Sequence, residues 1–369
     1  MQVSLPFLGE YPLRQILTRP VFAARTGRRD RREHRPETRS SASERSPSNM
    51  HESYLNKFFS GEPLAASRLM SIVERGGAEA EAVLDALFPR TGRAYRLGVT
   101  GLAGAGKSTL VNHFIRRYRK ENLTVGVVAE DPTSPFSGGA VLGDRVRMID
   151  SQGDPGVFIR SIASRGSETG FSEKAGELAD VLDAFGRDVV LLETIGIGQL
   201  EYKIRFAAHT TVVVLTPDAG DDVQSLKSGL MEIADVFAVN KSDRPGGREY
   251  AEDLKSMIGL RSRGNAWEPL VVATVGVTGE GVDDLAGAVN SHREFLDRRG
   301  LREEKRIQAL RTRIEALAEE KLREMLRQNE YSKNHIDGVL KEVAAGRKSP
   351  YQAAAEIVSS VLAENRGRS

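Results

Sequence analysis

The chain has 369 residues, of which 40% are hydrophobic and 28% are charged, and its formal net charge is +2. That length allows a large core and more than one module. The sequence contains no cysteine, which excludes a disulfide framework, a catalytic thiol and a thiolate metal site. No apolar run approaches the roughly 18 residues that a membrane span needs, so we expect no membrane partner.

Residues 1–52 predict a disordered, Arg-rich extension, because arginine, serine and proline recur there without a sustained period. Two alternatives are a transit peptide, which acidic residues such as Glu10 and Asp30 disfavour, and sequence upstream of a start at Met50. A nucleic-acid-binding arm is a third. No aromatic or groove-reading pattern accompanies the charge, so we expect no nucleic acid partner. We expect a cytoplasmic protein, or a mitochondrial matrix protein if the extension is a transit peptide.

Residues 53–92 predict an N-terminal helical segment. Apolar residues such as Leu55, Phe58 and Phe59, and later Leu69, Ile72 and Val73, recur at the spacing of short amphipathic helices. Pro89 to Gly92 then interrupts the helical pattern and leads into an apolar run. We expect these helices to pack beside the domain that follows.

A phosphate-binding loop follows the apolar run from Tyr95 to Val99. Gly101, four residues, and then Gly106-Lys107-Ser108 match the pattern G-x-x-x-x-G-K-[ST]. The run predicts a buried strand, and helical spacing of apolar residues after the loop predicts a helix over 107–118. A glycine-rich turn with a surface lysine is the alternative. The predicted nucleotide contacts of the loop are Gly101, Gly104, Ala105, Gly106, Lys107, Ser108 and Thr109.

The chemistry of phosphate binding explains these residue types. Glycines let the backbone curl around an anion, and the amides and helix N-terminus then point partial positive charge at the phosphates. We predict that Lys107 reaches the β- and γ-phosphates and that the Ser108 hydroxyl is a ligand of Mg²⁺.

Further apolar runs predict the remaining strands of a sheet. They are mostly continuous rather than alternating, as is typical of strands that are covered on both faces of a parallel sheet. Ligands of such sheets bind at the carboxyl ends of the strands, so the polar residues that end the runs are candidate site residues. The runs span 125–129, 189–192, 211–215, 236–239 and 270–274.

Two of these runs end in carboxylates that suit a metal-bound phosphate. The run 125–129 leads to Asp131 and then Asp144 in a Gly/Pro/Ser-rich stretch, where an aspartate before a proline is also a common turn signal. The run 189–192 ends in Glu193, with Gly196 three residues later. In GTPases a carboxylate, two residues and a glycine at this point hold Mg²⁺ through water and sense the γ-phosphate. A strand end with a glycine turn is the alternative here.

The run 236–239 ends in Asn240-Lys241-Ser242-Asp243, an Asn-Lys-x-Asp pattern. Its carboxylate can accept the N1 and N2 hydrogens of guanine, while the lysine stem covers the base; adenine lacks such a pair of donors. After a phosphate loop and at a strand end, the pattern predicts guanine recognition by Asn240, Lys241 and Asp243. We therefore predict an α/β P-loop GTPase domain with a mostly parallel central sheet over residues 93–290.

Residues 291–369 predict a C-terminal helical region. An apolar stripe surrounded by charged residues runs from Ile307 to Leu326, and a further helix begins near Ser349-Pro350. Such a stripe needs a partner surface, which is either the chain's own domain or a second copy.

With these residues assembled, the chain resembles the MeaB or ArgK type of GTPase, which chaperones adenosylcobalamin-dependent methylmalonyl-CoA mutase. The resemblance runs from about Tyr54 to Val361 and favours a dimerisation arm for the C-terminal region. Its marks are the phosphate loop and the stretches Pro89 to Arg93, Asp131 to Gly139, Gly143 to Met148, Asp154 to Ser161, Glu193 to Gln199 and Asn240 to Asp243.

The resemblance implies a homodimeric GTP-hydrolysing chaperone with GTP/GDP and Mg²⁺ as cofactors. Its partner would be an adenosylcobalamin-dependent acyl-CoA mutase, assisted in cofactor loading, protection or reactivation. The segment from Pro217 to Lys227 would be a partner-responsive switch loop. By position, Lys107, Asp131 and Glu193 would be the catalytic residues, and the metal ligands would be Ser108, Asp131, Asp144 and Glu193.

Two stretches depart from the family pattern. The family usually follows Val-Gly-Gln with acidic residues, whereas Gln199 is followed here by Leu200-Glu201-Tyr202-Lys203-Ile204-Arg205, which reverses the local charge. This leaves open which mutase is the partner. The base-edge motif written Ser-Ala elsewhere is best matched by Thr274-Val275, where a backbone amide could serve.

Two other functions share part of this pattern. A P-loop kinase acting on a small molecule or protein would share the phosphate loop, but the sequence has no distinct acceptor motif. A metallochaperone GTPase would need a Cys- or His-rich relay, which zero cysteines and six histidines do not provide.

We expect in-line attack of water on the γ-phosphate. Because neither an arginine finger nor a glutamine can be assigned, we expect slow intrinsic turnover that a partner accelerates.

Overall fold

The computed structural model describes residues 47–131, 153–163, 173–196, 203–217, 230–261, 266–328 and 330–366. The chain divides into two units, Met1–Arg45 and Ser46–Ser369, and the described residues belong to the second. In this part of the chain, no helix has the length and apolar composition to cross a membrane.

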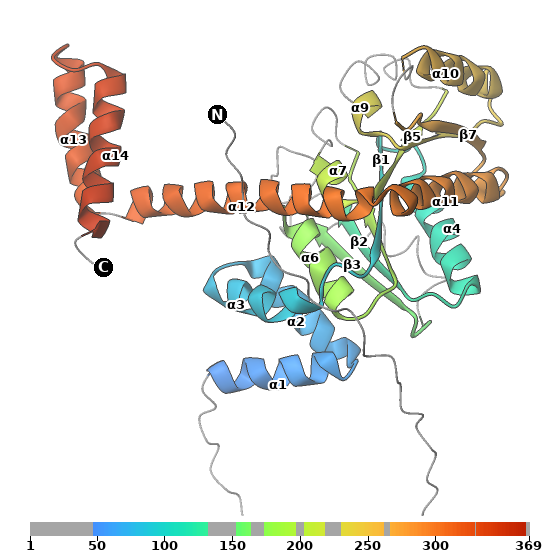
Figure 1. The fold of residues 1–369 in the computed structure, drawn as a ribbon, viewed down its shortest axis with the longest axis horizontal. Helices are drawn as coiled ribbons and strands as arrows, with labels where there is room; N and C mark the ends of the chain where they lie inside the picture. Colours follow the sequence, from blue (N-terminus) through green and yellow to red (C-terminus); the bar gives the residue numbers. More distant parts are fainter. Residues whose placement is uncertain are drawn as a thin grey trace, which may run out of the picture. The chain divides into compact units, whose positions relative to one another are not determined.

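A seven-stranded sheet forms the centre of the second unit, with the strand order β3-β2-β4-β1-β5-β6-β7, and its neighbouring strands run parallel (Figure 1). Six of these strands were predicted from the sequence, and each lies within a residue or two of its predicted bounds. The strands are β1 Tyr95–Gly101, β2 Val125–Asp131, β3 Val157–Ala163, β4 Val189–Glu193, β5 Thr210–Leu215, β6 Val236–Asn240 and β7 Leu270–Thr274.

β3 was not predicted as a strand. It lies at the sheet edge with β2 as its neighbour, and most of its residues are only partly buried. Arg160 and Ser161 interrupt the apolar run that identifies a central strand. An edge strand needs one apolar face rather than two, so its sequence carries a weaker signal.

Two apolar layers sandwich the sheet, as its continuous apolar strands require. One layer joins β-strand residues such as Leu192 and Val213 to the helices α2 (Pro63–Arg75), α3 (Ala78–Leu87), α6 and α10. The other joins Leu97, Val99 and Val214 to α4 and α11. The helices of the domain are α4 Lys107–Lys120, α6 Glu173–Ala184, α7 Ile204–Ala207, α9 Met231–Ile233, α10 Gly247–Arg261 and α11 Val282–Arg299.

The N-terminal helices are α1 Pro47–Phe59, α2 Pro63–Arg75, α3 Ala78–Leu87 and the short 3₁₀ turn η1 Phe88–Arg90. Among them, α2, α3 and η1 pack on α6, and α1 packs on α2. Pro63 occupies the first turn of α2, where its missing N–H costs nothing. The boundary expected at residue 53 falls inside α1, which begins at Pro47.

The C-terminal region continues from α11 into the long helix α12 Leu301–Gln328, with the left-handed Gly300 between the two helices. α12 packs against α7 and α11, and α13 Glu330–Ala344 packs against α14 Pro350–Arg366 (Figure 1). The predicted apolar stripe of α12 is partly solvent-exposed: Ile307 is 56% exposed and Ile314 is 65% exposed. One face of α12 therefore covers its own domain while another carries uncovered apolar side chains.

Candidate nucleotide-binding site

The predicted motifs meet at the carboxyl edge of the sheet. In the register of the parallel strands, Val99 of β1 lies opposite Glu193 of β4, and Asn240 of β6 lies opposite Thr274 of β7. β1 ends at Gly101, directly before the phosphate loop and α4. Four strand ends from distant parts of the sequence thus lie at one edge, where parallel sheets bind ligands.

Glycines of the phosphate loop are required by close backbone approach. Gly101 has φ 133°, and a Cβ there would lie 2.1 Å from the carbonyl oxygen of Val214. Gly106 caps α4 in the left-handed region, and a Cβ there would lie 2.2 Å from Asn240 Nδ2. No other residue fits either position without moving a neighbouring strand end, so the loop keeps its backbone amides near the helix N-terminus.

Lys107 lies at the start of α4 and turns back over the loop. Its Nζ donates hydrogen bonds to the carbonyl oxygens of Gly101 at 2.8 Å, Leu102 at 2.9 Å and Ile195 at 3.4 Å. The residue is buried, with 6% of its surface exposed. The ammonium group therefore lies between the phosphate loop and the segment after β4, where a phosphate chain bound by the loop would meet it.

Gly196, in the segment after β4, packs against the phosphate loop and Lys107. Its carbonyl oxygen accepts a hydrogen bond from the amide of Ala103 at 3.1 Å, and its φ is 84°. A Cβ at Gly196 would lie 2.4 Å from Lys107 Nζ and 2.5 Å from the Gly101 carbonyl oxygen. Only glycine fits there, so the glycine three residues after Glu193 has a defined steric reason.

Ser108 and Glu193 form the part of the site that suits Mg²⁺. Ser108 Oγ donates a 2.6 Å hydrogen bond to Glu193 Oε1, and both residues are buried. A carboxylate and a hydroxyl are hard oxygen ligands, so these two residues fit the ion. Beside them, Thr100 Oγ1 and Thr194 Oγ1 lie 2.9 Å apart and join the ends of β1 and β4.

Asn240 connects the phosphate loop to the base side of the site. Its Nδ2 donates to the Ala105 carbonyl oxygen at 2.7 Å, and its Oδ1 accepts from the Gly276 amide at 2.9 Å and from Thr274 Oγ1 at 3.2 Å. Lys241 follows with a positive φ of 58°, uncommon for a residue with a side chain. Asp243 lies two residues further on and is solvent-exposed.

Gly276 and His113 belong to this region and were not predicted. The carbonyl oxygen of Gly276 lies 2.8 Å from His113 Nε2 on α4, and because a carbonyl only accepts, that ring nitrogen carries the hydrogen. The Val275 amide donates to the Glu280 carbonyl oxygen at 2.9 Å, so it is engaged within its own turn. Gly276 could have been predicted from the sequence, because a glycine directly follows the base-edge pair Thr274-Val275. His113 could not, because a single histidine in a helix does not indicate a contact.

Several predicted residues lie wholly or partly outside the described part. Asp144 and the segments Gln199 to Tyr202 and 218–229, which include most of the expected switch loop, are outside it. Asp131 ends β2 opposite Ala163 of β3, and only its backbone is described. Thr109 is half-buried in α4, and Gly104 has φ 77°.

The model of one protein family, described as Methylmalonyl Co-A mutase-associated GTPase MeaB, matches residues 66–331. The chain belongs to this family. The match extends from α2 through the sheet to the start of α13, so it includes the helices before and after the nucleotide edge.

Individual relatives of this chain also support its assignment to the MeaB family. A putative GTPase of Pyrococcus abyssi is 41% identical over 82% of this chain and 94% of that protein. The GTPase ArgK of Escherichia coli K12 is 35% identical over 69% of this chain and 81% of that protein. A crystal structure titled LAO/AO transport system kinase has a TM-score of 0.64 at 25% identity, and it covers 87% of this chain and 100% of that one. This MeaB-family chain is therefore a P-loop GTPase, and the edge described above is its candidate guanine nucleotide site.

Proposed function

We propose that this MeaB-family GTPase is a chaperone of an adenosylcobalamin-dependent acyl-CoA mutase of the methylmalonyl-CoA mutase type, assisting cofactor loading, protection or reactivation. The observation that carries the proposal is the match of residues 66–331 to a family described by its association with that mutase. The match includes α12, which lies outside the nucleotide edge, so the likeness is not limited to the parts that every P-loop GTPase shares.

The arrangement of the edge supports hydrolysis of the γ-phosphate by in-line attack of water. Lys107, held between the carbonyls of Gly101, Leu102 and Ile195, would neutralise charge on the β- and γ-phosphates. Ser108 and Glu193, joined at 2.6 Å, would hold Mg²⁺, with Asp131 and Asp144 as further proposed ligands. The ion, when bound, supplies positive charge to the phosphate oxygens. Asp243 would accept the guanine hydrogens.

The proposed assembly is a homodimer through the uncovered face of α12. Ile307 and Ile314 lie two helical turns apart on that face and are both more than half exposed. Replacing both with glutamate should give a monomer that still binds nucleotide, as measured by sedimentation. Glu315→Ala on the same helix is a control that removes no apolar contact. A wild-type protein that sediments as a monomer would exclude this dimer.

The chaperone proposal is tested by adding a purified adenosylcobalamin-dependent methylmalonyl-CoA mutase and measuring GTP turnover with γ-labelled nucleotide. We expect slow release of inorganic phosphate by the protein alone and faster release with the mutase. An unrelated cobalamin enzyme is the control for non-specific stimulation. Identical rates with and without the mutase, together with no detectable complex, would rule the proposal out.

A kinase is the second function to test, because a related solved structure bears the name LAO/AO transport system kinase. The same experiment distinguishes the two functions by where the labelled phosphate ends. A kinase would leave the label on a protein or a small molecule rather than as inorganic phosphate. The described residues give no reason to prefer this function, because the contacts of Lys107, Ser108 and Glu193 involve the phosphate side of the site alone.

A further inference from the structure

The base-edge loop, residues 275–280, lies between β7 and α11 at the nucleotide edge. It contains a tight turn, because the amide of Thr278 donates a 3.1 Å hydrogen bond to the carbonyl oxygen of Val275. The two middle residues of this turn are Gly276 and Val277. Turns of this kind occur with their middle peptide in either of two opposite orientations. The orientation of the Gly276–Val277 peptide therefore decides which group the loop presents to a ligand.

One amide of the base-edge loop is left for a ligand. The other amides of the loop donate within the protein, and they belong to Val275, Gly276, Thr278, Gly279 and Glu280. The amide of Val277 has no acceptor among the described residues. Val277 is also 93% exposed, whereas Gly276 beside it is buried. An acceptor on a bound molecule can therefore reach the Val277 N–H.

His113 of α4 holds the other side of the same peptide. Its Nε2 donates a 2.8 Å hydrogen bond to the carbonyl oxygen of Gly276. In a trans peptide the carbonyl and the N–H point in opposite directions. With the Gly276 carbonyl turned toward α4, the Val277 N–H points away from that helix. The hydrogen bond from His113 thus fixes the direction of the one loop amide that a ligand can use.

Close packing against α4 restricts the loop further. A Cβ at Gly279 would lie 3.3 Å from His113 Cε1, and a Cβ at Gly276 would lie 3.3 Å from the methyl carbon of Thr109. These are closer than ordinary van der Waals contacts, so the two glycines let the loop lie directly on α4. The same helix begins with Lys107, which binds the phosphate loop. α4 therefore places both the phosphate side and the base-edge loop of the site.

We propose that His113 is a positioning residue for guanine recognition, which orients the Gly276–Val277 peptide so that the Val277 N–H donates to the O6 oxygen of guanine. This inference rests on the guanine site proposed above, in which Asp243 accepts the N1 and N2 hydrogens. O6 is bonded to the carbon next to N1, and β7, which leads into the loop, pairs with β6, which leads to Asp243. Adenine has an amino group in place of O6, so an N–H donor at this point favours guanine.

Two analogues of GDP separate this contact from the contacts of Asp243. In 6-thioguanosine diphosphate a sulfur replaces O6, and sulfur is a weak hydrogen-bond acceptor. This analogue keeps the hydrogens on N1 and N2. Inosine diphosphate keeps O6 but lacks the N2 amino group. Calorimetric titration with GDP and both analogues therefore measures the O6 contact and the N2 contact separately.

Three variants are compared with the wild type. His113→Leu removes the donor and keeps a side chain of moderate size. His113→Gln is the conservative variant, because its amide nitrogen lies about as far along the side chain as Nε2 of histidine and can donate to Gly276. Lys120→Leu is the matched control at the exposed end of α4. Circular dichroism establishes that each variant is folded, and His113→Asn, whose shorter amide does not reach Gly276, replaces His113→Leu if the latter does not fold.

We expect the wild type to bind GDP about fivefold to tenfold more tightly than 6-thioguanosine diphosphate, the factor for one hydrogen bond. His113→Leu should weaken GDP and inosine diphosphate by a similar factor of about fivefold to tenfold. It should weaken the thio analogue by less than about twofold, because the O6 contact is already weak there. His113→Gln should recover most of the affinity for GDP, and Lys120→Leu should bind all three nucleotides as the wild type does.

The result that overturns the proposal is equal weakening of all three nucleotides in His113→Leu, because the histidine would then support the site in general and not the O6 contact. Unchanged GDP affinity in that variant, no recovery in His113→Gln, or equal binding of GDP and the thio analogue by the wild type would overturn it as well. Equal affinity of the wild type for GDP and ADP is a different failure, since it rejects the guanine site on which the inference rests.

Discussion

The nucleotide edge and the junction between α6 and α12 hold their polar side chains in different ways. At the edge, Lys107 and Asn240 bind mainly to backbone carbonyls and amides of nearby loops. At the junction, Asp180 is held by two arginines that are 84 and 133 residues away in the sequence. Backbone partners depend on local glycines and strand ends, whereas side-chain partners depend on the tertiary fold. The first arrangement leaves a motif in the sequence and the second does not.

The largest effect is expected from Lys107→Ala, which removes the ammonium group from the phosphate loop. GTP hydrolysis should fall by at least about 10²-fold, because a donor placed for developing charge is lost. Measured single-turnover rates should be compared with Lys120→Ala, an exposed lysine at the other end of α4 that should behave as wild type. Near-normal hydrolysis by Lys107→Ala would show that the motif is no more than a turn.

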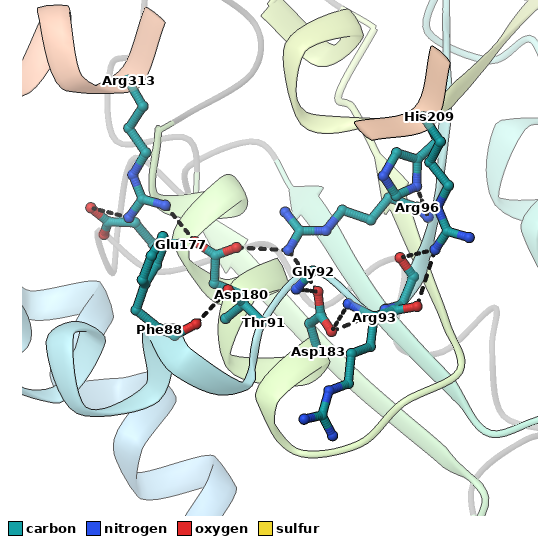
Figure 2. Close-up of polar contacts among 12 residues, drawn as sticks. Phe88, Thr91, Gly92, Arg93, Arg96, Glu177, Asp180, Asp183, His209 and Arg313 are labelled. Atoms are coloured by element: carbon teal, nitrogen blue, oxygen red, sulfur yellow. Dashed lines mark hydrogen bonds and ion pairs between the residues drawn. The ribbon is translucent and has the colours of Figure 1, made fainter. Parts of the chain in front are cut away.

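This division explains what the sequence could predict. Gly101, Gly106 and Gly196 were identified because close backbone approach permits only glycine, and six strands were identified because central parallel strands are continuously apolar. The edge strand β3 was missed because Arg160 and Ser161 break its pattern. The ion pairs that join β1, α6 and α12 (Figure 2) could not be predicted, because nothing local in the sequence connects Arg96 to Asp180 and Arg313.

Asp180→Ala tests the junction directly. The substitution removes the hydrogen bonds of Asp180 with Arg96 and Arg313, while Asp183 and Glu177 stay as partners of the two arginines. Two lost hydrogen bonds to charged groups, at about 1.5 to 2 kcal/mol each, predict a loss of about 3 to 4 kcal/mol of unfolding free energy. Guanine nucleotide affinity should change little, since the edge is separate. Asp283→Ala is the control: its pair with Arg117 is 91% exposed on the carboxylate side and should contribute less than about 1 kcal/mol. An equal, small loss in both variants would contradict the difference between the two regions.

A slightly smaller effect is expected for the pH dependence of stability, through the buried His292 of α11. Burial, and then Lys305, lower the pKa of His292 from 6.5 to about 4, although Asp235 acts in the opposite direction. Because the folded state favours the neutral ring, this stability is fully present above pH 6.5 and is lost as pH falls toward 4. The loss is at most about 3 kcal/mol. Denaturant unfolding at several pH values should show it, and His292→Gln should flatten the profile; an unchanged profile would contradict the assignment.

We propose that the carboxyl edge of the sheet is a guanine nucleotide site in which Asp243 reads the base. Calorimetric titration of wild type and Asp243→Asn with GDP and with xanthosine diphosphate tests it in one set of measurements. The xanthine base has a carbonyl in place of the guanine N2 amino group, and an asparagine amide can donate to it. We expect Asp243→Asn to weaken GDP by roughly 1.5 to 3 kcal/mol and to tighten xanthosine diphosphate. Unchanged GDP affinity in the variant, or equal affinity of the wild type for GDP and ADP, would contradict the claim.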